Sequence, residues 1–223
     1  MIAGLVPAGV YAKDAFGDRG PLADVTLFPA ELTAVQGESE DRRREFTTVR
    51  GCARAALAEL GVAPAPLVPR ALGAPRWPAG VVGTMTHCRG YRAAAVARAA
   101  RFAALGIDAE PLEPLPPAVA ARIANARESA WLRDDFAPAG PPPERLLFSA
   151  KEASYKAFSP WLGDRFGFRD FTVRIRPDGT FRVTPPDSGT PLPATVDKDL
   201  TGYWIARHGF VVTVVAVPGG RPS

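Results

Sequence analysis

The spacing of apolar and polar residues along this chain predicts a series of helices and short strands. Apolar positions recur with helical spacing in some segments, and alternate or run together in others. In the N-terminal part the pattern predicts a strand at residues 4–12, helices at 31–36 and 38–60, and strands at 81–86, 91–98 and 102–107. Gly61 ends the long helix, and the last two strands are expected to pair as a hairpin.

A second series follows a proline-rich connector. The pattern predicts helices at 117–135 and 149–158 and strands at 171–176, 180–184, 203–206 and 210–217. Pro-Asp-Gly between the first two of these strands, and His208-Gly209 between the last two, predict hairpin turns. Ser149 is expected to cap its helix, with Glu152 completing a capping box. Both series combine helices with antiparallel strands, so the predicted fold class is α+β.

Composition limits the classes of function. The 223 residues suit one large domain or two smaller halves, and 47% hydrophobic with 22% charged residues is typical of a soluble globular protein. The net charge of +4 mildly favours an acidic or phosphate-bearing partner. Basic residues form no long run and no aromatic–basic RNA motif occurs, so no nucleic-acid partner is expected. Two cysteines exclude a disulfide framework and a zinc cluster.

The N-terminal stretch MIAGLVPAGVYAKDAFGD lacks the basic region and apolar core of a signal peptide. No apolar run approaches the roughly 20 residues that a helix needs to cross a bilayer. We therefore expect a cytoplasmic protein with no membrane partner.

Asp108 and Glu110 stand one residue apart in LGIDAEPLEP, where an apolar strand ends. Side chains alternate between the faces of a strand, so both carboxylates project to the same side if the strand continues. Close carboxylates repel each other, and a hard cation such as Mg²⁺ between them removes the repulsion. A solvated strand end is the structural alternative, and for an isolated Asp-x-Glu it is the commoner one.

The stretch FSAKEASYKAF is the second concentration of charge, on a predicted helix. Its first turns carry Lys151, Glu152, Tyr155 and Lys156. Glu152 would add a third carboxylate to a metal site, and the lysines would meet phosphates near the start of a helix. Glu152 and Lys156 also have the i, i+4 spacing of an ordinary stabilising pair.

Together these stretches resemble the two signature motifs of the Sfp-type 4'-phosphopantetheinyl transferases. GIDAE fits (V/I)-G-(I/V)-D-x-E, and FSAKEASYK fits (F/W)-x-x-K-E-x-x-x-K. RRREFTTVRGCAR resembles the family's basic helix, GTMTHCRGYRAAAV its Ser/Thr-His segment, and GAPRWPAG the element before that segment. The likeness is greatest to the bacterial siderophore and polyketide branch, especially its actinobacterial members.

The resemblance implies a pseudo-dimer of two similar α+β halves, with coenzyme A in the cleft between them. The expected halves are 1–112, with the basic helix, the Thr-His segment and Asp-x-Glu, and 113–223, with the Lys-Glu-x-x-x-Lys helix. The implied activity moves the 4'-phosphopantetheine arm of coenzyme A to a serine of an apo acyl, peptidyl or aryl carrier protein. The other product is 3',5'-ADP. One chain with both halves is expected to be a monomer.

The resemblance also assigns metal and catalytic residues. Mg²⁺, with Mn²⁺ as the alternative ion, would be held by Asp108, Glu110 and Glu152. Ala109 offers no ligand atom, so water would take that position. Glu152 would act as general base, directly or through water, and Lys156 would hold the pyrophosphate or stabilise the leaving phosphate.

The implied coenzyme-binding residues are Arg42, Arg50, Arg70, Thr86, His87, Asp108, Lys151 and Lys156. Arg42 and Arg50 are eight residues apart, about 2.2 helical turns, and so lie on roughly one face; a solvated basic helix is the structural alternative. Arg70, or Arg76, replaces a connector lysine that many relatives carry. Lys151 has the alternative of facing solvent.

Two other functions remain as alternatives. A non-catalytic protein of the same fold would bind coenzyme A or carrier domains, and a Mg-dependent hydrolase would use water in place of serine. The resemblance implies clients in nonribosomal peptide, polyketide, siderophore or fatty-acid synthesis without naming one.

Overall fold

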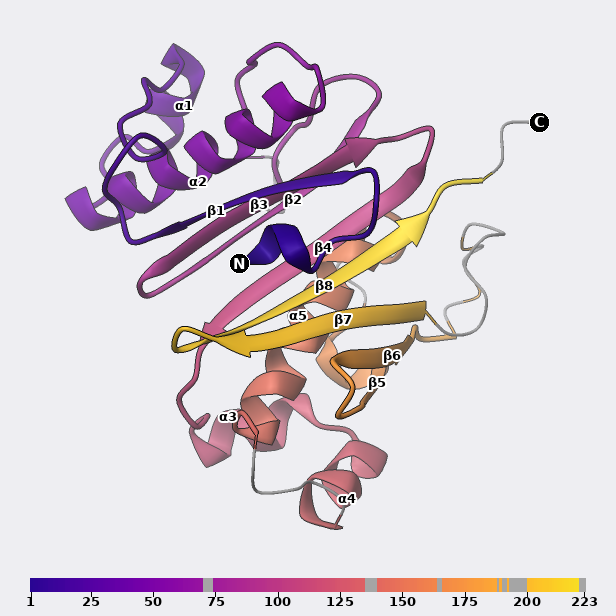
Figure 1. Ribbon diagram of the computed structural model, residues 1–223. Coiled ribbons are helices and arrows are strands. Elements are labelled where there is room, and N and C mark those ends of the chain that lie inside the picture. The colour runs from indigo at the N-terminus through magenta and orange to yellow at the C-terminus, as the bar shows by residue number, and fades with distance from the viewer. Residues whose placement is uncertain are drawn as a thin grey trace.

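The computed structural model describes residues 1–69, 74–134, 140–163, 166–187, 189, 192 and 200–220. Within these ranges the chain forms two antiparallel sheets, each with a long helix packed on one face (Figure 1). Helices α1 and α2 lie at the top of this view and α3 and α4 at the bottom, with the sheets between them. The α+β class expected from the sequence is confirmed.

The first unit holds the smaller sheet. It comprises β1 (Val10–Phe16), α1 (Pro29–Ala34), α2 (Glu40–Glu59), β2 (Val81–Cys88) and β3 (Tyr91–Arg98), with strand order β1-β3-β2. Ser39 caps α2 by accepting a hydrogen bond from the Arg42 amide at 3.3 Å. The turn between β2 and β3 depends on Gly90, whose φ of 86° lies in the left-handed region.

The second unit holds the larger sheet, of order β4-β8-β7-β6-β5. It comprises β4 (Phe102–Pro111), α3 (Pro117–Ile123), α4 (Ala126–Asp134), α5 (Pro143–Leu162), β5 (Thr172–Ile175), β6 (Thr180–Thr184), β7 (Leu200–Arg207) and β8 (Phe210–Pro218). α5 packs on β4 and β8. No helix in the described ranges is both long enough and apolar enough to cross a membrane.

The two units repeat one plan. In each, a strand precedes a 20-residue helix, and the last strand of a following hairpin pairs with that first strand. The orders β1-β3-β2 and β4-β8-β7 therefore correspond, and β6 and β5 extend the second sheet. This repetition agrees with the expected pseudo-dimer. The division after residue 112 stays a prediction; β4, which it places in the first half, is hydrogen-bonded to β8.

Three buried clusters stabilise the molecule: one between α2 and the first sheet, one between α5 and the second, and one between the sheets. The central cluster includes Val10, Tyr91, Ile107 and Val214. Full burial of such side chains is worth about 1.5–3 kcal/mol each. β2 and β4 lie side by side at this junction, where the Ile107 amide donates to Thr84 Oγ1 at 3.3 Å.

β4 passes unusually close to α5. A Cβ at Gly106 would lie 1.8 Å from the carbonyl oxygen of Ala153, so only glycine permits this approach. Asp108, two residues further along, faces the same side of the strand. The close approach therefore brings Asp108 to the helix.

The predicted hairpin of residues 91–98 with 102–107 is wrong. β3 pairs with β1 and β2, and β4 pairs with β8. A two-residue turn at Gly90 favours the β2–β3 hairpin locally, whereas the partner of β4 comes from the far end of the chain. The first strand begins at Val10 rather than at residue 4, because Ile2–Gly4 form a 3-10 turn.

Two helix boundaries also differ from the prediction. The helix expected at 149–158 runs from Pro143 to Leu162, so Ser149 is a buried interior residue rather than a cap; its hydroxyl lies 2.9 Å from Thr213 Oγ1. The helix expected at 117–135 is two helices. Asn125 and Glu128 exchange side-chain-to-backbone hydrogen bonds of 2.8 and 3.0 Å, which starts α4 anew.

Candidate active site

Asp108 on β4 is the centre of the candidate site. It is only 4% exposed. Its Oδ1 accepts hydrogen bonds from Lys156 Nζ at 2.8 Å and from Thr86 Oγ1 at 3.1 Å. Its Oδ2 is buried and has no hydrogen-bond partner in the described structure. A buried carboxylate oxygen without a donor is costly, and it is a ready ligand for a cation.

Lys156 joins three elements at this point. From α5 its Nζ donates to Asp108, to the backbone oxygen of Ile107 at 3.1 Å on β4, and to Thr86 Oγ1 at 3.4 Å on β2. Glu152, one turn earlier, has Oε2 at 4.0 Å from the same Nζ. The structure thus brings Thr86, Asp108, Glu152 and Lys156 together, although they are distant in sequence.

Glu110 shares the environment of Asp108 but has a different partner. Arg145 Nη1 donates to Glu110 Oε2 at 2.7 Å, and Arg145 Nε donates to the backbone oxygen of Glu113 at 2.7 Å. Burial raises the pKa of Glu110 to about 7, with a further contribution from the charge of Asp108, while Arg145 opposes the shift. Burial, and then Asp108, also raise the pKa of Glu152, against the effect of Lys156. The three carboxylates therefore repel one another.

The three predicted metal ligands, Asp108, Glu110 and Glu152, are chemically suited to a hard divalent ion. Their carboxylate oxygens are the donors that Mg²⁺ and Mn²⁺ prefer, and Asp108 Oδ2 is unpartnered. Lys156 and Arg145 neutralise Asp108 and Glu110 as the side chains stand. In this arrangement no three His, Cys, Asp or Glu residues of the described chain form a group that could hold a metal.

A second polar group lies on α2 and at the end of β2. Arg42 Nη1 lies 2.8 Å from His87 Nε2. Glu45 Oε2 lies 3.5 Å from Arg42 Nη1 and 3.6 Å from His87 Nδ1, and Glu45 Oε1 accepts from Arg92 Nη2 at 3.1 Å. Lys156, which binds Asp108, is close enough for its charge to act on His87, so this basic group lies near the carboxylate group.

Arg50 is placed differently from Arg42. It is 7% exposed, its guanidinium lies 3.3 Å from the centre of the Phe46 ring, and it donates to the Leu67 carbonyl from Nε (3.3 Å) and Nη2 (3.1 Å). Burial, chiefly, lowers the pKa of Arg50 to about 10. Arg50 thus fastens the connector to α2. Arg70, the predicted connector residue, lies outside the described residues.

Comparisons with known proteins agree with this geometry. A model described as the 4'-phosphopantetheinyl transferase N-terminal domain matches residues 30–97, and one described as the 4'-phosphopantetheinyl transferase superfamily matches residues 104–215. Relatives include 4'-phosphopantetheinyl transferase Svp of Streptomyces mobaraensis, 45% identical over 97% of this chain and 89% of its own. Npt of Nocardia iowensis is 39% identical (97% and 99%), and PptT of Mycobacterium tuberculosis 36% (97% and 98%).

The chain belongs to the 4'-phosphopantetheinyl transferase superfamily. The matches span both structural units and include every described residue that was predicted for the site. The motif-based assignment of the family is therefore confirmed.

In this transferase the structure does not bring Lys151 to the other predicted site residues. Its side chain is fully buried and its Nζ lies 2.6 Å from Glu128 Oε2. It also donates to the backbone oxygens of Phe168 (2.7 Å) and Phe171 (3.0 Å). Lys151 therefore links α5 to α4 and to the segment before β5. The alternative that it faces solvent is wrong.

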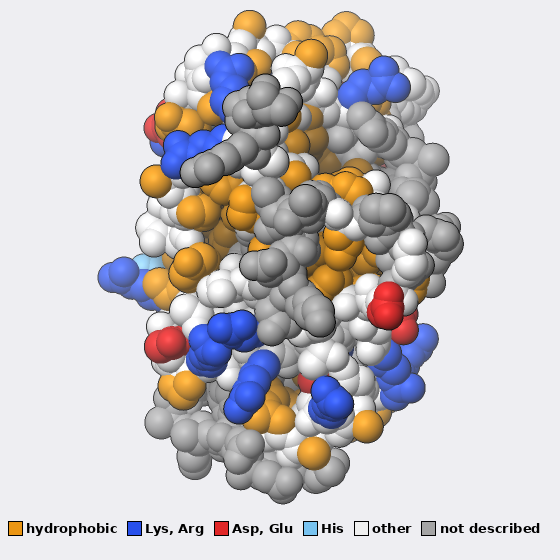
Figure 2. Space-filling model, turned by 90° about the vertical axis from the view of Figure 1, so that its right-hand side faces the viewer, with side chains coloured by type: hydrophobic (Ala, Val, Ile, Leu, Met, Phe, Trp, Pro, Cys, Tyr) orange, Lys and Arg blue, Asp and Glu red, His pale blue; other side chains and the backbone are white. Residues whose placement is uncertain are grey.

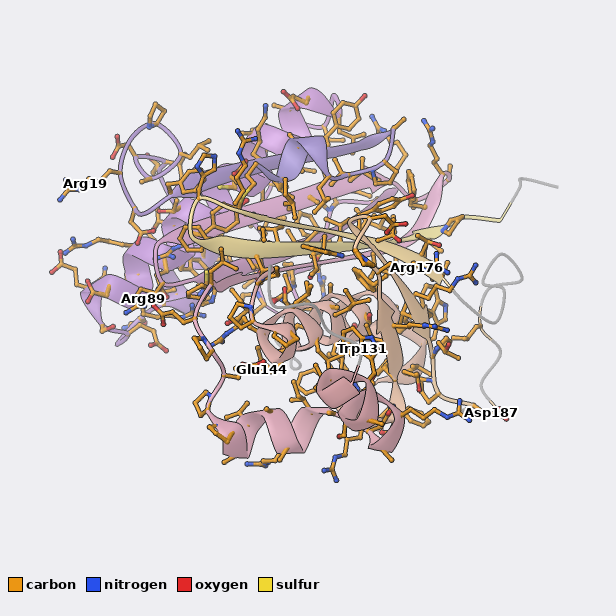
Figure 3. The ribbon with its side chains drawn as sticks, turned by 60° about the horizontal axis from the view of Figure 1, so that its bottom comes forward. Arg19, Arg89, Trp131, Glu144, Arg176 and Asp187 are labelled. Carbon is orange, nitrogen blue, oxygen red and sulfur yellow. The ribbon has the colours of Figure 1, made fainter. Side chains whose placement is uncertain are left out.

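Sequence reasoning missed two charged residues at the candidate site, Glu45 and Arg145, and a third, Glu128, at the Lys151 junction. Glu45 was part of a charge run, Arg145 follows a proline-rich stretch, and Glu128 lies in a helix with little pattern. Only Glu128 had a readable signal, because Asn125 and Glu128 have the spacing of a helix-capping pair. In Figure 3, Arg89, on the β2–β3 turn, lies at the left of the view, and Glu144, at the start of α5, lies nearer the middle. Glu113 connects the two regions by contacting Arg89 and Arg145.

A cavity of about 390 Å³ adjoins α5 in the second unit. Its lining includes Val119, Ile123, Phe148 and Phe168, with Arg122 and Arg169 among its polar residues. Phe148 is one helical turn before Glu152 on α5. This open cavity thus begins one helical turn from the predicted general base.

Proposed function

We propose that this protein transfers the 4'-phosphopantetheine arm of coenzyme A to a serine of an apo carrier protein, with Mg²⁺ as its metal and Mn²⁺ as the alternative. The observation that carries the proposal is the convergence of Asp108, Glu152 and Lys156 where β2, β4 and α5 meet. A buried, unpartnered carboxylate oxygen there suits a phosphate-bound divalent ion better than a structural role.

In the proposed reaction the serine oxygen forms a bond to the phosphorus that carries pantetheine. The pyrophosphate bond breaks, and its electrons leave with 3',5'-ADP. Glu152 takes the serine proton directly or through water, and Lys156 compensates charge on the leaving phosphate. Asp108, Glu110 and Glu152 would hold the Mg²⁺, which supplies neutralisation of the pyrophosphate charge when bound. The rest of the catalysis is positioning.

We assign the phosphates of the coenzyme to the basic side of the site. Thr86, His87 and Arg42 are the proposed contacts, supported by the proximity of His87 to Arg42. Arg50 would act mainly by fixing the connector, with Arg70 as a further candidate. Lys151 would act on the coenzyme only indirectly, because it holds α5 against α4 and the segment before β5. The apolar cavity beside Phe148 is the proposed place for the pantetheine arm.

The proposed partners are acyl, peptidyl or aryl carrier domains. A net charge of +4 favours acidic proteins, and Figure 2 shows Lys and Arg spread over one face with few acidic groups. Arg174 and Arg182 are exposed and lie opposite each other on β5 and β6. The pathway served, the monomeric state and the cytoplasmic location stay predictions.

Intact-mass spectrometry of several apo carrier domains tests the proposal. Each is incubated with the protein and coenzyme A, with Mg²⁺ or with EDTA. We expect a gain of one phosphopantetheine that EDTA abolishes. Binding of coenzyme A without transfer to any carrier would favour a non-catalytic binding protein. Release of 3',5'-ADP without a carrier would favour a hydrolase.

A further inference from the structure

Glu45 has no assigned role, yet it lies between the cationic groups beside the site. It is a partly buried residue of α2 whose two oxygens face Arg42 and His87 on one side and Arg92 on the other. Arg92 is also held by Asp18, with hydrogen bonds of 3.0 and 2.7 Å from Nε and Nη2. Arg92 therefore keeps a partner without Glu45, whereas no other described anion within ion-pair distance faces Arg42 and His87.

The contacts of His87 define its protonation. Arginine has only donors, so His87 Nε2 must accept the 2.8 Å hydrogen bond from Arg42 Nη1. The proton of a neutral imidazole then resides on Nδ1, which faces Glu45 Oε2 at 3.6 Å. The negative charge of Glu45 thus favours the tautomer that carries its proton on Nδ1 and leaves Nε2 free to accept from Arg42.

The charged groups facing His87 are Arg42 and Glu45 from α2, Arg92 from β3 and Lys156 from α5. Burial first, and then the cations, lower the pKa of His87 below its ordinary value; Glu45 is the one group among them that opposes the shift. The hydrogen bond from Arg42 and this lowered pKa both favour a neutral His87 before an anion binds. A phosphate would reverse this balance, because it adds negative charge on the Nε2 side.

We propose that Glu45 is a positioning residue that allows His87 to take up a proton when a phosphate of the coenzyme binds. The inference rests on the proposed function. As phosphate binds, Arg42 donates to its oxygen instead of to Nε2. Nε2 then takes a proton from solvent and donates to the phosphate, while Nδ1–H continues to face Glu45. Only this proton is gained, and no covalent bond between heavy atoms changes.

Calorimetry of 3',5'-ADP binding in buffers of different ionisation enthalpy measures the proton directly. At pH 8 the ligand phosphates are almost fully ionised, since their second pKa is about 6, so uptake comes from the protein. We expect the wild-type protein to take up a proton fraction well above zero. His87→Asn should abolish that uptake.

Glu45→Gln tests the positioning role, because it keeps the shape and the acceptor for Arg92 but removes the charge. We expect much smaller proton uptake, binding of 3',5'-ADP weaker by about tenfold, and a higher KM for coenzyme A with kcat changed far less. Glu45→Asp should restore part of the uptake. Glu40→Gln is the matched control, since Glu40 is exposed on the same helix and pairs with Arg44.

Wild-type proton uptake and affinity in folded Glu45→Gln would overturn the proposal. So would binding of 3',5'-ADP to the wild-type protein without any uptake, which would leave the transferase function intact. No binding of 3',5'-ADP or coenzyme A to folded wild-type protein would instead contradict the proposed function. A merely structural role of Glu45 would lower thermal stability in Glu45→Gln without changing the proton count.

Discussion

Asp108 uses its two oxygens differently. Oδ1 accepts from a lysine and a threonine, and Oδ2 is buried without a donor. Leaving such an atom unpaired costs about 1–3 kcal/mol, which a bound cation would recover. We infer that the local fold holds this carboxylate ready for a ligand at some cost in stability.

At Glu152 the test is a substitution that preserves shape. Glu152→Gln removes the proposed base and a metal ligand, and should lower kcat for transfer by about 10²–10⁴-fold with unchanged circular dichroism. Glu144→Gln, on the same helix, is the control and should transfer normally. Near-normal transfer by Glu152→Gln would refute the assigned role.

Cys52 offers a prediction about alkaline pH. It lies on the buried face of α2, and desolvation raises its pKa to about 12, against about 8.5 in an unfolded chain. Above pH 9 the unfolded state therefore loses a proton that the folded state keeps, and stability falls as pH rises. The loss approaches about 1.4 kcal/mol per pH unit from this group. Urea unfolding between pH 8 and 10.5 should show that the free energy of unfolding falls less steeply with pH in Cys52→Ala than in the wild type. Equal slopes in the two proteins would contradict the raised pKa of Cys52.

At the scale of elements, the buried pair of Lys151 and Glu128 ties α5 to α4. Glu128 also accepts from the Val173 amide at 2.7 Å, which adds β5 to the same junction. A lysine in a family signature is thus used for packing here. Because the Lys151–Glu128 pair fixes the orientation of α5, it also determines where the neighbouring Glu152 lies.

Lys151→Met should lower the free energy of unfolding by about 3–5 kcal/mol, because it leaves the Glu128 charge buried and unpaired. Adding Glu128→Gln should recover part of this loss. Arg44→Met removes an exposed pair with Glu40 and should cost less than about 1 kcal/mol. Urea denaturation measures the free energy of unfolding of all three variants. Equal losses from the buried pair and the exposed pair would contradict a stabilising role of the Lys151–Glu128 pair.

Elements with local signals were predictable from the sequence. α2 has a serine cap and a glycine stop, and the hairpins of the second sheet have turn residues. The partner of β4 was not predictable, because strand pairing across most of the chain depends on packing and not on a local pattern. The family motifs identified Asp108, Glu152 and Lys156, but the partners Glu45 and Arg145 contact the site only through the folded geometry.

At the scale of the molecule, the central cluster makes the two units depend on each other. Ile107 is fully buried there, between the sheets. Ile107→Ala should destabilise the protein by about 2–5 kcal/mol. Tryptophan fluorescence and circular dichroism should report the same single urea transition, both in the wild-type protein and in Ile107→Ala. Separate transitions for the two units would contradict a common core.

The repeated plan of the two units does not extend to the carboxylates of the candidate site. Asp108 pairs with Thr213, four residues after the turn glycine Gly209; the matching residue after Gly90 is Ala94, which pairs with Lys13. By the same count Glu110 corresponds to Ala15. A symmetric pair of such units would carry carboxylates at both places. In this chain only the second unit carries carboxylates at these two positions, so the repeated backbone plan supports one predicted metal site and not two.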